Sequence, residues 1–369
     1  MSHKLSFRSA AVILAGTALL LCLSGLHPNH ALAKRKPTPP PPEPVSYVEA
    51  ATDFLRTQIG PVGLLDSYVE DNADYSYTYD NALAAMAFIS AGDLDSARTI
   101  LDAFARIGPD YNGGFVHRYN SIDGQPVEGI AGVGHNAYLL QAVNLYYLET
   151  HDPRYNNLAS TLAAHILSYQ DSDGGLFGRP SVSWKSAENN LAGYCALNNL
   201  GVNLGISAYK SSAALIKNFL ITECWDGSRF LTGENDTMIV TDVQALGTLI
   251  LGADYSNGSY WIQPHTLTTR RYDRRKSITG FDMNTDKDTV WTEGTLQQSL
   301  AYLLAGDLPK SNAFRSEAEK LFQGSGALRQ ASNTGTSGFG DTFQPWQAVA
   351  PTAWYIFVHN QDNPFEILK

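Results

Sequence analysis

The chain has 369 residues, and its 36 Asp and Glu against 26 Lys and Arg give a formal net charge of −10. This acidic balance argues against nucleic acid as a partner, because no basic face is left to neutralise phosphates. The one basic cluster, at 270–276, is typical of a solvated loop, although an anionic glycan would also suit it.

The first residues are predicted to lie outside the folded part. An almost wholly apolar run at 10–26 precedes Ala-Leu-Ala at 31–33, which offers small residues at a cleavage site. This is the pattern of a secretory signal peptide over 1–33, and the run is shorter than the ~20 apolar residues of a membrane anchor. A basic, proline-rich linker follows at 34–46. We therefore expect an exported protein, periplasmic or extracellular, with no membrane span after cleavage.

Gly-rich turns divide the rest of the chain, 47–369, into pairs of segments. The turns lie at 60–64, 112–115, 173–176, 226–230, 279–282 and 324–328. A spacing of roughly 45–60 residues is typical of a helical repeat.

Apolar periodicity predicts a helix on each side of these turns. In chain order the helices are expected at 46–58, 78–91, 94–107, 134–149, 154–170, 186–199, 206–222, 241–253, 290–305, 310–323 and 350–359. A further segment, 258–268, contains Pro264 and is expected to be distorted. Helices that are apolar all round are buried, so alternate helices should form an inner ring of six within an outer ring. The predicted fold is all-α, an (α/α)6 toroid of six helical hairpins, with an open solenoid as the alternative.

The mature chain would keep two cysteines, Cys195 and Cys224. The oxidising compartment reached by export allows a disulfide between them. Two buried free thiols are equally consistent with the sequence, because Cys is often a small core residue.

Four of the expected inner helices begin with an acidic residue, namely Asp80, Glu188, Asp242 and Glu293. Any one of them alone is explained as a helix cap. In a closed ring, however, all four would face one cavity, and paired carboxylates are what cleavage of a glycosidic bond requires. These four residues are the predicted catalytic residues.

Aromatic residues near the acids are predicted to bind sugar rings. The predicted substrate-binding residues are Tyr79, His135, Trp184, Trp291 and Trp346. Glu128 and Asp282, in turns near the helix starts, are weaker candidates. No zinc, phosphate-loop or nucleophile-elbow motif is present, so neither a metal nor a cofactor is expected, although Asp286 and Asp288 are spaced like calcium ligands.

The acids are expected to differ in pKa. Glu293 lies between Trp291 and Gly294, and shielding by the indole should raise its pKa. Asp80 begins a helix whose free N–H groups should lower its pKa. The hypothesis is that Glu293 is the general acid and Asp80 the base, with Glu188 and Asp242 as the alternatives for these two roles.

Several motifs occur in a set order along the chain. They are Tyr79-Asp80-Asn81-Ala82-Leu83, Ser186-Ala187-Glu188-Asn189-Asn190-Leu191-Ala192-Gly193-Tyr194, Trp291-Thr292-Glu293-Gly294-Thr295, and Ala350-Pro351-Thr352-Ala353-Trp354 with Asn363-Pro364-Phe365. In this combination the chain resembles exported bacterial members of the six-hairpin glycosidase superfamily. In the second motif Asn189 stands in place of a His and Ala192 in place of an acid. The resemblance implies the toroid, and it implies hydrolysis less strongly because the same fold hosts other chemistries.

The sequence therefore predicts an exported, monomeric glycoside hydrolase that cleaves a polysaccharide or oligosaccharide by inversion. A polysaccharide lyase is one alternative, and it would gather His135, Tyr138, Arg118 and Lys185 at one end of the cleft. A non-catalytic glycan-binding protein of an exopolysaccharide system is the other, because the acid missing at Ala192 removes a candidate catalytic group.

Overall fold

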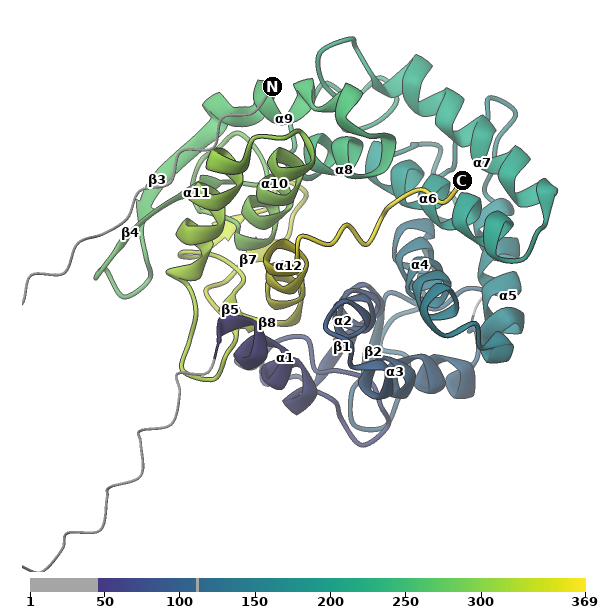
Figure 1. Ribbon diagram of the computed structural model, residues 1–369, viewed down its shortest axis with the longest axis horizontal. Coiled ribbons are helices and arrows are strands. Elements are labelled where there is room, and N and C mark those ends of the chain that lie inside the picture. The colour runs from purple at the N-terminus through teal and green to yellow at the C-terminus, as the bar shows by residue number, and fades with distance from the viewer. Residues whose placement is uncertain (1–45, 111–112) are drawn as a thin grey trace, which may run out of the picture. The chain divides into compact units, whose positions relative to one another are not determined.

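The computed structural model describes residues 46–110 and 113–369, which belong to one compact unit of the chain. The predicted signal peptide and nearly all of the predicted linker lie outside these residues. Within them, twelve α-helices form two concentric rings (Figure 1). None of the described helices has the length and apolar content needed to cross a bilayer.

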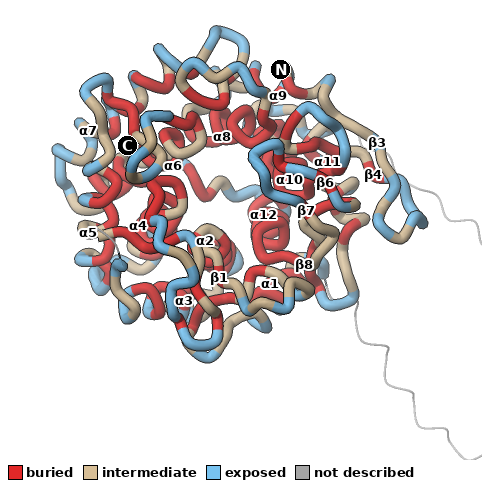
Figure 2. The backbone as a smooth tube through the Cα atoms, turned by 180° about the vertical axis from the view of Figure 1, so that it is seen from behind, coloured by how far each residue is buried: buried red, intermediate tan, exposed pale blue. Residues whose placement is uncertain are grey.

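The inner ring is closed. Each inner helix packs against the next, and the last packs against the first, so the structure is a toroid and the open solenoid is excluded. The inner helices are α2 (Thr78–Ser90), α4 (Val133–Thr150), α6 (Ala187–Asn203), α8 (Asp242–Leu251), α10 (Thr292–Leu304) and α12 (Val349–Asn360). They are buried over most of their length, as Figure 2 shows, because the neighbouring inner helices and the outer helices cover them.

The outer helices are amphipathic, short or both. They are α1 (Tyr47–Thr57), α3 (Leu94–Ile107), α5 (Asn156–Leu167), α7 (Ser207–Phe219), α9 (Asn257–Ile262) and α11 (Leu308–Glu319). In α3, for example, Ile100, Leu101 and Phe104 are buried while the opposite face is polar. The distortion expected around Pro264 is confirmed, because α9 ends at Ile262 and continues as a 3-10 turn over Gln263–His265.

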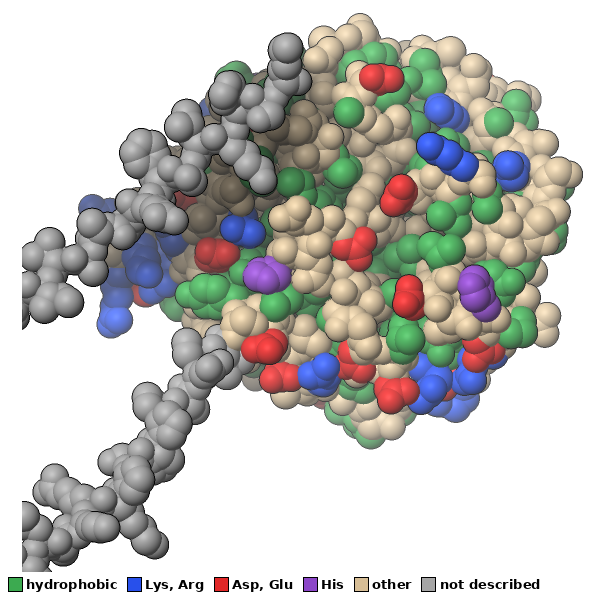
Figure 3. All heavy atoms as spheres, viewed as in Figure 1, with side chains coloured by type: hydrophobic (Ala, Val, Ile, Leu, Met, Phe, Trp, Pro, Cys, Tyr) green, Lys and Arg blue, Asp and Glu red, His purple; other side chains and the backbone are tan. Residues whose placement is uncertain are grey.

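Strands are few and form antiparallel pairs. The pairs are β1 (Tyr75–Tyr77) with β2 (Arg118–Asn120), β3 (Thr266–Arg270) with β4 (Ser277–Phe281), β5 (Leu328–Arg329) with β8 (Gln347–Ala348), and β6 (Gly335–Thr336) with β7 (Thr342–Phe343). The basic cluster forms the tip of the β3–β4 hairpin, where Arg274, Arg275 and Lys276 are exposed and Lys and Arg side chains gather in Figure 3.

One hydrogen bond recurs in all six hairpins. A polar side chain in the first turn of each inner helix accepts a bond of 2.7 to 3.0 Å from the backbone N–H of an apolar residue in the preceding turn. The pairs are Asn81 with Leu65, Asn136 with Phe115, Asn190 with Leu176, Gln244 with Phe230, Thr295 with Phe281, and Thr352 with Leu328. Each of these side chains also donates to the carbonyl four residues before it. The bond therefore fixes how each inner helix is rotated against its turn.

The C-terminal segment crosses one face of the ring (Figure 1). Asn363 donates to the carbonyl of Leu249 on α8 at 2.7 Å, and the carbonyl of Pro364 accepts from Gln141 on α4 at 2.8 Å. Phe365, 1% exposed, packs against Tyr138. In Figure 3 this face is filled by packed atoms over the ring centre, so the segment forms a floor opposite the helix starts.

Cys195 and Cys224 are both buried and both free. Of the two alternatives left open by the sequence, the free thiols are confirmed and the disulfide is not formed.

We expect Thr352→Val to destabilise the fold by about 1–3 kcal/mol in the free energy of unfolding. The substitution keeps the side-chain shape, but it leaves the buried N–H of Leu328 without its acceptor. Chemical denaturation measures the loss, and Thr352→Ser, which keeps the hydroxyl, is the matched control. Equal stability of the Val variant and the native chain would show that the repeated bond does not support the ring.

Candidate active site

The inner helix starts surround a cavity of about 890 Å³. The recurring hydrogen bond explains which residues reach it. The residue two positions before each of these acceptor side chains is rotated by about 200° from it around the helix axis. It therefore faces away from the turn and toward the ring centre. The six residues at this position all line the cavity, and they are Tyr79, Gly134, Glu188, Asp242, Glu293 and Ala350.

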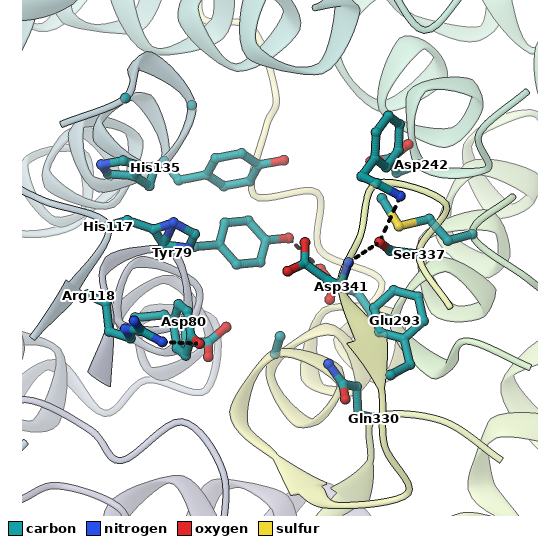
Figure 4. A pocket seen from close by; sticks show the side chains of 18 of the residues that line it. Tyr79, Asp80, His117, Arg118, His135, Asp242, Glu293, Gln330, Ser337 and Asp341 are labelled. Atoms are coloured by element: carbon teal, nitrogen blue, oxygen red, sulfur yellow. Dashed lines mark hydrogen bonds between the residues drawn. The ribbon is translucent and has the colours of Figure 1, made fainter. Parts of the chain in front are cut away.

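All four predicted catalytic residues thus lie around one cavity, Asp80 being one position further along than Tyr79. Figure 4 shows Tyr79 and Asp80 on one side of the pocket and Asp242 and Glu293 on the other. Glu188 lines the same cavity from the start of α6.

Glu293 is held by three donors that all reach the same oxygen. Tyr79 Oη, Trp354 Nε1 at 3.1 Å and Gln297 Nε2 at 3.3 Å each donate to its Oε1. A proton on this carboxyl group therefore resides on Oε2, which accepts from none of these donors. Burial raises the pKa of Glu293 to about 8, against the effect of the Tyr79 hydrogen bond and with the help of the charges of Asp80 and Asp242.

Glu188 and Asp242 are close enough to influence each other's protonation. Burial, and then the charge of Asp242, raises the pKa of Glu188 to about 8. Burial also raises the pKa of Asp242, but only to about 6, because backbone N–H groups at the start of α8, including that of Val243, stabilise its ionised form. The start of α8 therefore favours the ionised form of Asp242.

The expected lowering of the pKa of Asp80 is wrong. Burial raises it to about 7, and a hydrogen bond with Ser67 only partly offsets this. The side chain is 4% exposed, so the loss of hydration outweighs the field of the helix start. Burial thus raises the pKa of both Glu293 and Asp80, so the expected difference in direction between the two is not found.

The cavity walls are rich in aromatic rings. Tyr79, Trp291 and Trp346 line it, together with other tyrosines and phenylalanines. The Tyr79 ring lies 4.6 Å from that of Tyr138, and Trp346 lies 5.9 Å from Tyr68. Ring faces and edges of this kind provide apolar surface inside an otherwise acidic cavity.

His135 also lines the cavity, in its neutral form. Its Nε2–H donates to the carbonyl of Phe115 at 2.9 Å, and burial, followed by the charge of His117, lowers its pKa to about 3. His117 stacks on it with a ring separation of 5.5 Å. A side chain so hard to protonate is suited to hydrogen bonding with a ligand and not to donating a proton.

Two residues singled out in the sequence lie elsewhere. Trp184 does not line the cavity, because the loop before α6 packs its indole against Gly233. Lys185 is also outside it and pairs with Asp171 and Asp173. Glu128 does line it, beside Arg118.

Asp282 holds a turn. Its carboxylate accepts from the backbone N–H groups of Met283, Asp288 and Thr289, and it is 1% exposed. Carboxylate oxygens of Asp282, Asp286 and Asp288 lie within 4.8 Å of one another, which is the arrangement that the calcium-like spacing suggested. Backbone and side-chain donors of the protein already occupy much of their hydrogen-bonding capacity.

Positive charge is scarce in the cavity. Among the described residues that line it, only Arg118 and Arg179 carry a permanent positive charge. Arg118 contacts Glu128 at 3.5 Å and lies over the ring of Tyr75, while Arg179 is exposed. The inner part of the cavity therefore offers no free cation to an anionic ligand.

The sequence analysis missed two residues that hold Glu293. Gln297 is one helical turn beyond it, is 1% exposed, and its Oε1 has no partner among the described residues. The buried polar run Gln297-Gln298-Ser299 on an inner helix is the signal that could have identified it. Trp354 does not line the cavity but belongs to a motif quoted above, and only the structure shows where its indole N–H points.

No protein-family model and no curated protein matches this chain. Solved structures do match it. A wild-type glycosidase superposes on 87% of this chain and 97% of its own, with a TM-score of 0.69 and 12% identity. A novel alpha-amylase from Clostridium perfringens covers 86% of this chain and 98% of its own, with a TM-score of 0.63 and 9% identity. A sugar epimerase from a ruminal bacterium covers 84% and 95%, with a TM-score of 0.64 and 13% identity.

At this level of identity the likeness concerns the fold. The chain has the (α/α)6 toroid fold of the six-hairpin glycosidase type, as its motifs implied. The same fold in an epimerase means that activity must be argued from the cavity of this chain.

Trp354→Phe is expected to raise the pKa of Glu293 above about 8. The variant keeps an aromatic ring but removes the N–H, which stabilises the ionised carboxylate. NMR titration of ¹³C-labelled carboxylates, assigned with Glu293→Gln, measures the shift. Trp225→Phe, far from the acids in the chain and packed on Phe230, is the control and should leave it unchanged. A lower pKa in Trp354→Phe would contradict the three-donor arrangement.

Proposed function

We propose that the chain is an exported glycoside hydrolase that cleaves a neutral polysaccharide or oligosaccharide by inversion. The observation that carries the proposal is the set of four carboxyl groups around one aromatic-walled cavity. Three of them are buried, Glu188 is half-buried, and Glu293 accepts all three of its donors through a single oxygen. Hydrolysis of a glycosidic bond needs a protonated carboxyl group on one side of the bond and an ionised one on the other.

Glu293 is proposed as the general acid. Its pKa of about 8 keeps it protonated at neutral pH, and the three donors at Oε1 leave the proton on Oε2. From there it passes to the glycosidic oxygen as the bond to the anomeric carbon breaks. The charge left on Glu293 is then stabilised by Tyr79 and Trp354, which need no rearrangement to do so.

Asp242 is proposed as the general base. Backbone N–H groups at the start of α8 stabilise its ionised form, and with a pKa of about 6 it is ionised at neutral pH. In an inverting mechanism it removes a proton from the water that attacks the anomeric carbon. Glu188, with a pKa of about 8, and Asp80, at about 7, would line the cavity as hydrogen-bonding groups for sugar hydroxyls.

The lyase alternative is less well supported. Elimination from a uronate needs a cation that neutralises the substrate carboxylate. Of the two basic residues that this alternative places in the cleft, Lys185 lies outside the cavity and pairs with Asp173, and Arg118 contacts Glu128. The excess of acids favours a neutral sugar. The glycan-binding alternative requires the same cavity without turnover.

The test is a panel of neutral and uronate polysaccharides incubated with the purified mature chain. Product analysis by ¹H NMR gives the anomeric configuration of the first-formed sugar. Hydrolysis with inversion supports the proposal. Unsaturated products absorbing in the ultraviolet would establish a lyase, and binding without turnover of any glycan would establish the binding protein.

Export is proposed from the N-terminal pattern alone. Expression of the full chain in a bacterial host, followed by mass spectrometry of the extracytoplasmic fraction, should give a chain that starts at residue 34. An intact N-terminus in the cytoplasm would contradict it.

The activity should follow a bell-shaped pH profile. As pH rises through about 6, Asp242 loses its proton and activity increases. As pH rises through about 8, Glu293 loses its proton and activity falls. The dependence of kcat/KM on pH for the free enzyme measures both limbs. A profile that increases steadily through the alkaline range would exclude Glu293 as the acid.

Glu293→Gln is expected to lower kcat by about 10²–10⁴-fold while glycan binding is retained, because the amide keeps the shape but cannot supply the proton. Glu319→Gln is the matched control, since Glu319 also accepts from a tyrosine, Tyr355, but on the outer helix α11. Its activity should be unchanged. Near-native activity of Glu293→Gln would transfer the acid role to Glu188.

A further inference from the structure

The β6–β7 hairpin presents an exposed aromatic ring at the cavity. Phe339, in the loop between the two strands, lines the cavity and is nevertheless 46% exposed. In the view of Figure 4 its loop neighbour Asp341 is drawn between Tyr79 on one side and Glu293 on the other, with Ser337 beside it. The ring therefore presents uncovered apolar surface in the lining of the cavity.

The loop holds this ring in a defined position. Ser337, 4% exposed, accepts through its hydroxyl from the N–H groups of Phe339 at 3.1 Å and Asp341 at 3.2 Å. Its own N–H donates to the carbonyl of Asp341 at 3.0 Å. Gly338 and Gly340, with φ of 80° and 100°, provide the left-handed backbone on each side of Phe339. The turn is thus closed by its own hydrogen bonds while its apolar side chain points outward.

The base of the hairpin is fixed to the part of the structure that carries Glu293. Thr336 donates through its N–H to Asp288 at 3.0 Å and through its hydroxyl to Asp286 at 2.7 Å. On the other strand Phe343 stacks on Trp291 with rings 5.6 Å apart and 7° from parallel. Trp291 immediately precedes α10, so the distance between the loop and Glu293 is set by rigid contacts.

We propose that Phe339 is a sugar-binding platform beyond the point of cleavage, and that the substrate is an oligosaccharide or polysaccharide longer than a disaccharide. The inference rests on the proposed glycoside hydrolase function. The apolar C–H face of a pyranose ring would cover the exposed phenyl ring, while Asp341, two residues along, accepts from sugar hydroxyls. Short substrates, bound by the acids and the inner rings, would not reach it.

Phe339→Ala tests the proposal by its dependence on substrate length. For the glycan that the native chain cleaves, kinetics are measured on the disaccharide and the hexasaccharide of the same linkage. KM for the hexasaccharide should rise about tenfold, which is within the range of an aromatic contact, and that for the disaccharide should stay unchanged. Phe339→Trp, which keeps an aromatic ring at this position, should leave the KM for the hexasaccharide at its native value.

Binding to the inactive Glu293→Gln variant gives a second measurement free of turnover. Calorimetric titration with the hexasaccharide should show a similar loss when Phe339→Ala is added. Leu215→Ala is the matched control, because Leu215 is 55% exposed on the outer helix α7 and lies outside the cavity lining. It should change neither affinity nor KM.

An equal effect of Phe339→Ala on both substrate lengths, or no effect on either, would overturn the role of Phe339 and leave the hydrolase proposal intact. A native chain that neither cleaves nor binds any neutral glycan would overturn both. The two failures are therefore distinguishable in one set of assays.

Discussion

The rest of the structure depends on one repeated contact, the buried hydrogen bond between a turn and the inner helix that follows it. A backbone N–H in such a turn would otherwise be unpaired in the core, at a cost of about 1–3 kcal/mol. Asn, Gln and Thr all serve as the acceptor, so the ring depends on the bond and not on one residue type. Because each side chain also donates to a carbonyl of its own helix, it has little freedom to rotate.

This contact explains why a symmetric scaffold has an asymmetric site. The position two residues before the acceptor faces the cavity in every hairpin, whatever residue occupies it. In three hairpins it is Glu or Asp, and in the others it is Tyr79, Gly134 or Ala350. The acids at this position thus belong to three consecutive inner helices, α6, α8 and α10, while the missing side chain of Gly134 makes room for Asn189. Chemistry can vary at this position without disturbing the bond that holds the helix.

Much of the fold was predictable because its signal is periodic. The Gly-rich turns, the apolar inner helices and the distortion at Pro264 all follow from local composition. The helix-start acids were found for the same reason. The pKa of Asp80 was not, because local sequence reports the helix field but not the burial contributed by other hairpins. Trp354 was missed, and Tyr79 was not recognised as a donor to Glu293, because both are distant from Glu293 in the chain. Trp184 was wrongly assigned to the cavity because it is close to Glu188 in the sequence. The conformation of the loop before α6 instead places its indole against Gly233.

The C-terminal segment that crosses the ring has a consequence for how the protein is made. The first and last inner helices, α2 and α12, can meet only after the four inner helices between them in the chain have been synthesised. Phe365, which packs against Tyr138 and Trp354, follows α12 and therefore emerges after all six inner helices. Contacts between such distant segments form slowly, because the loop that they close is long. A chain interrupted before these residues would have most of its helices but no finished cavity floor, so an unfinished molecule would lack the supporting contact behind the donors to Glu293.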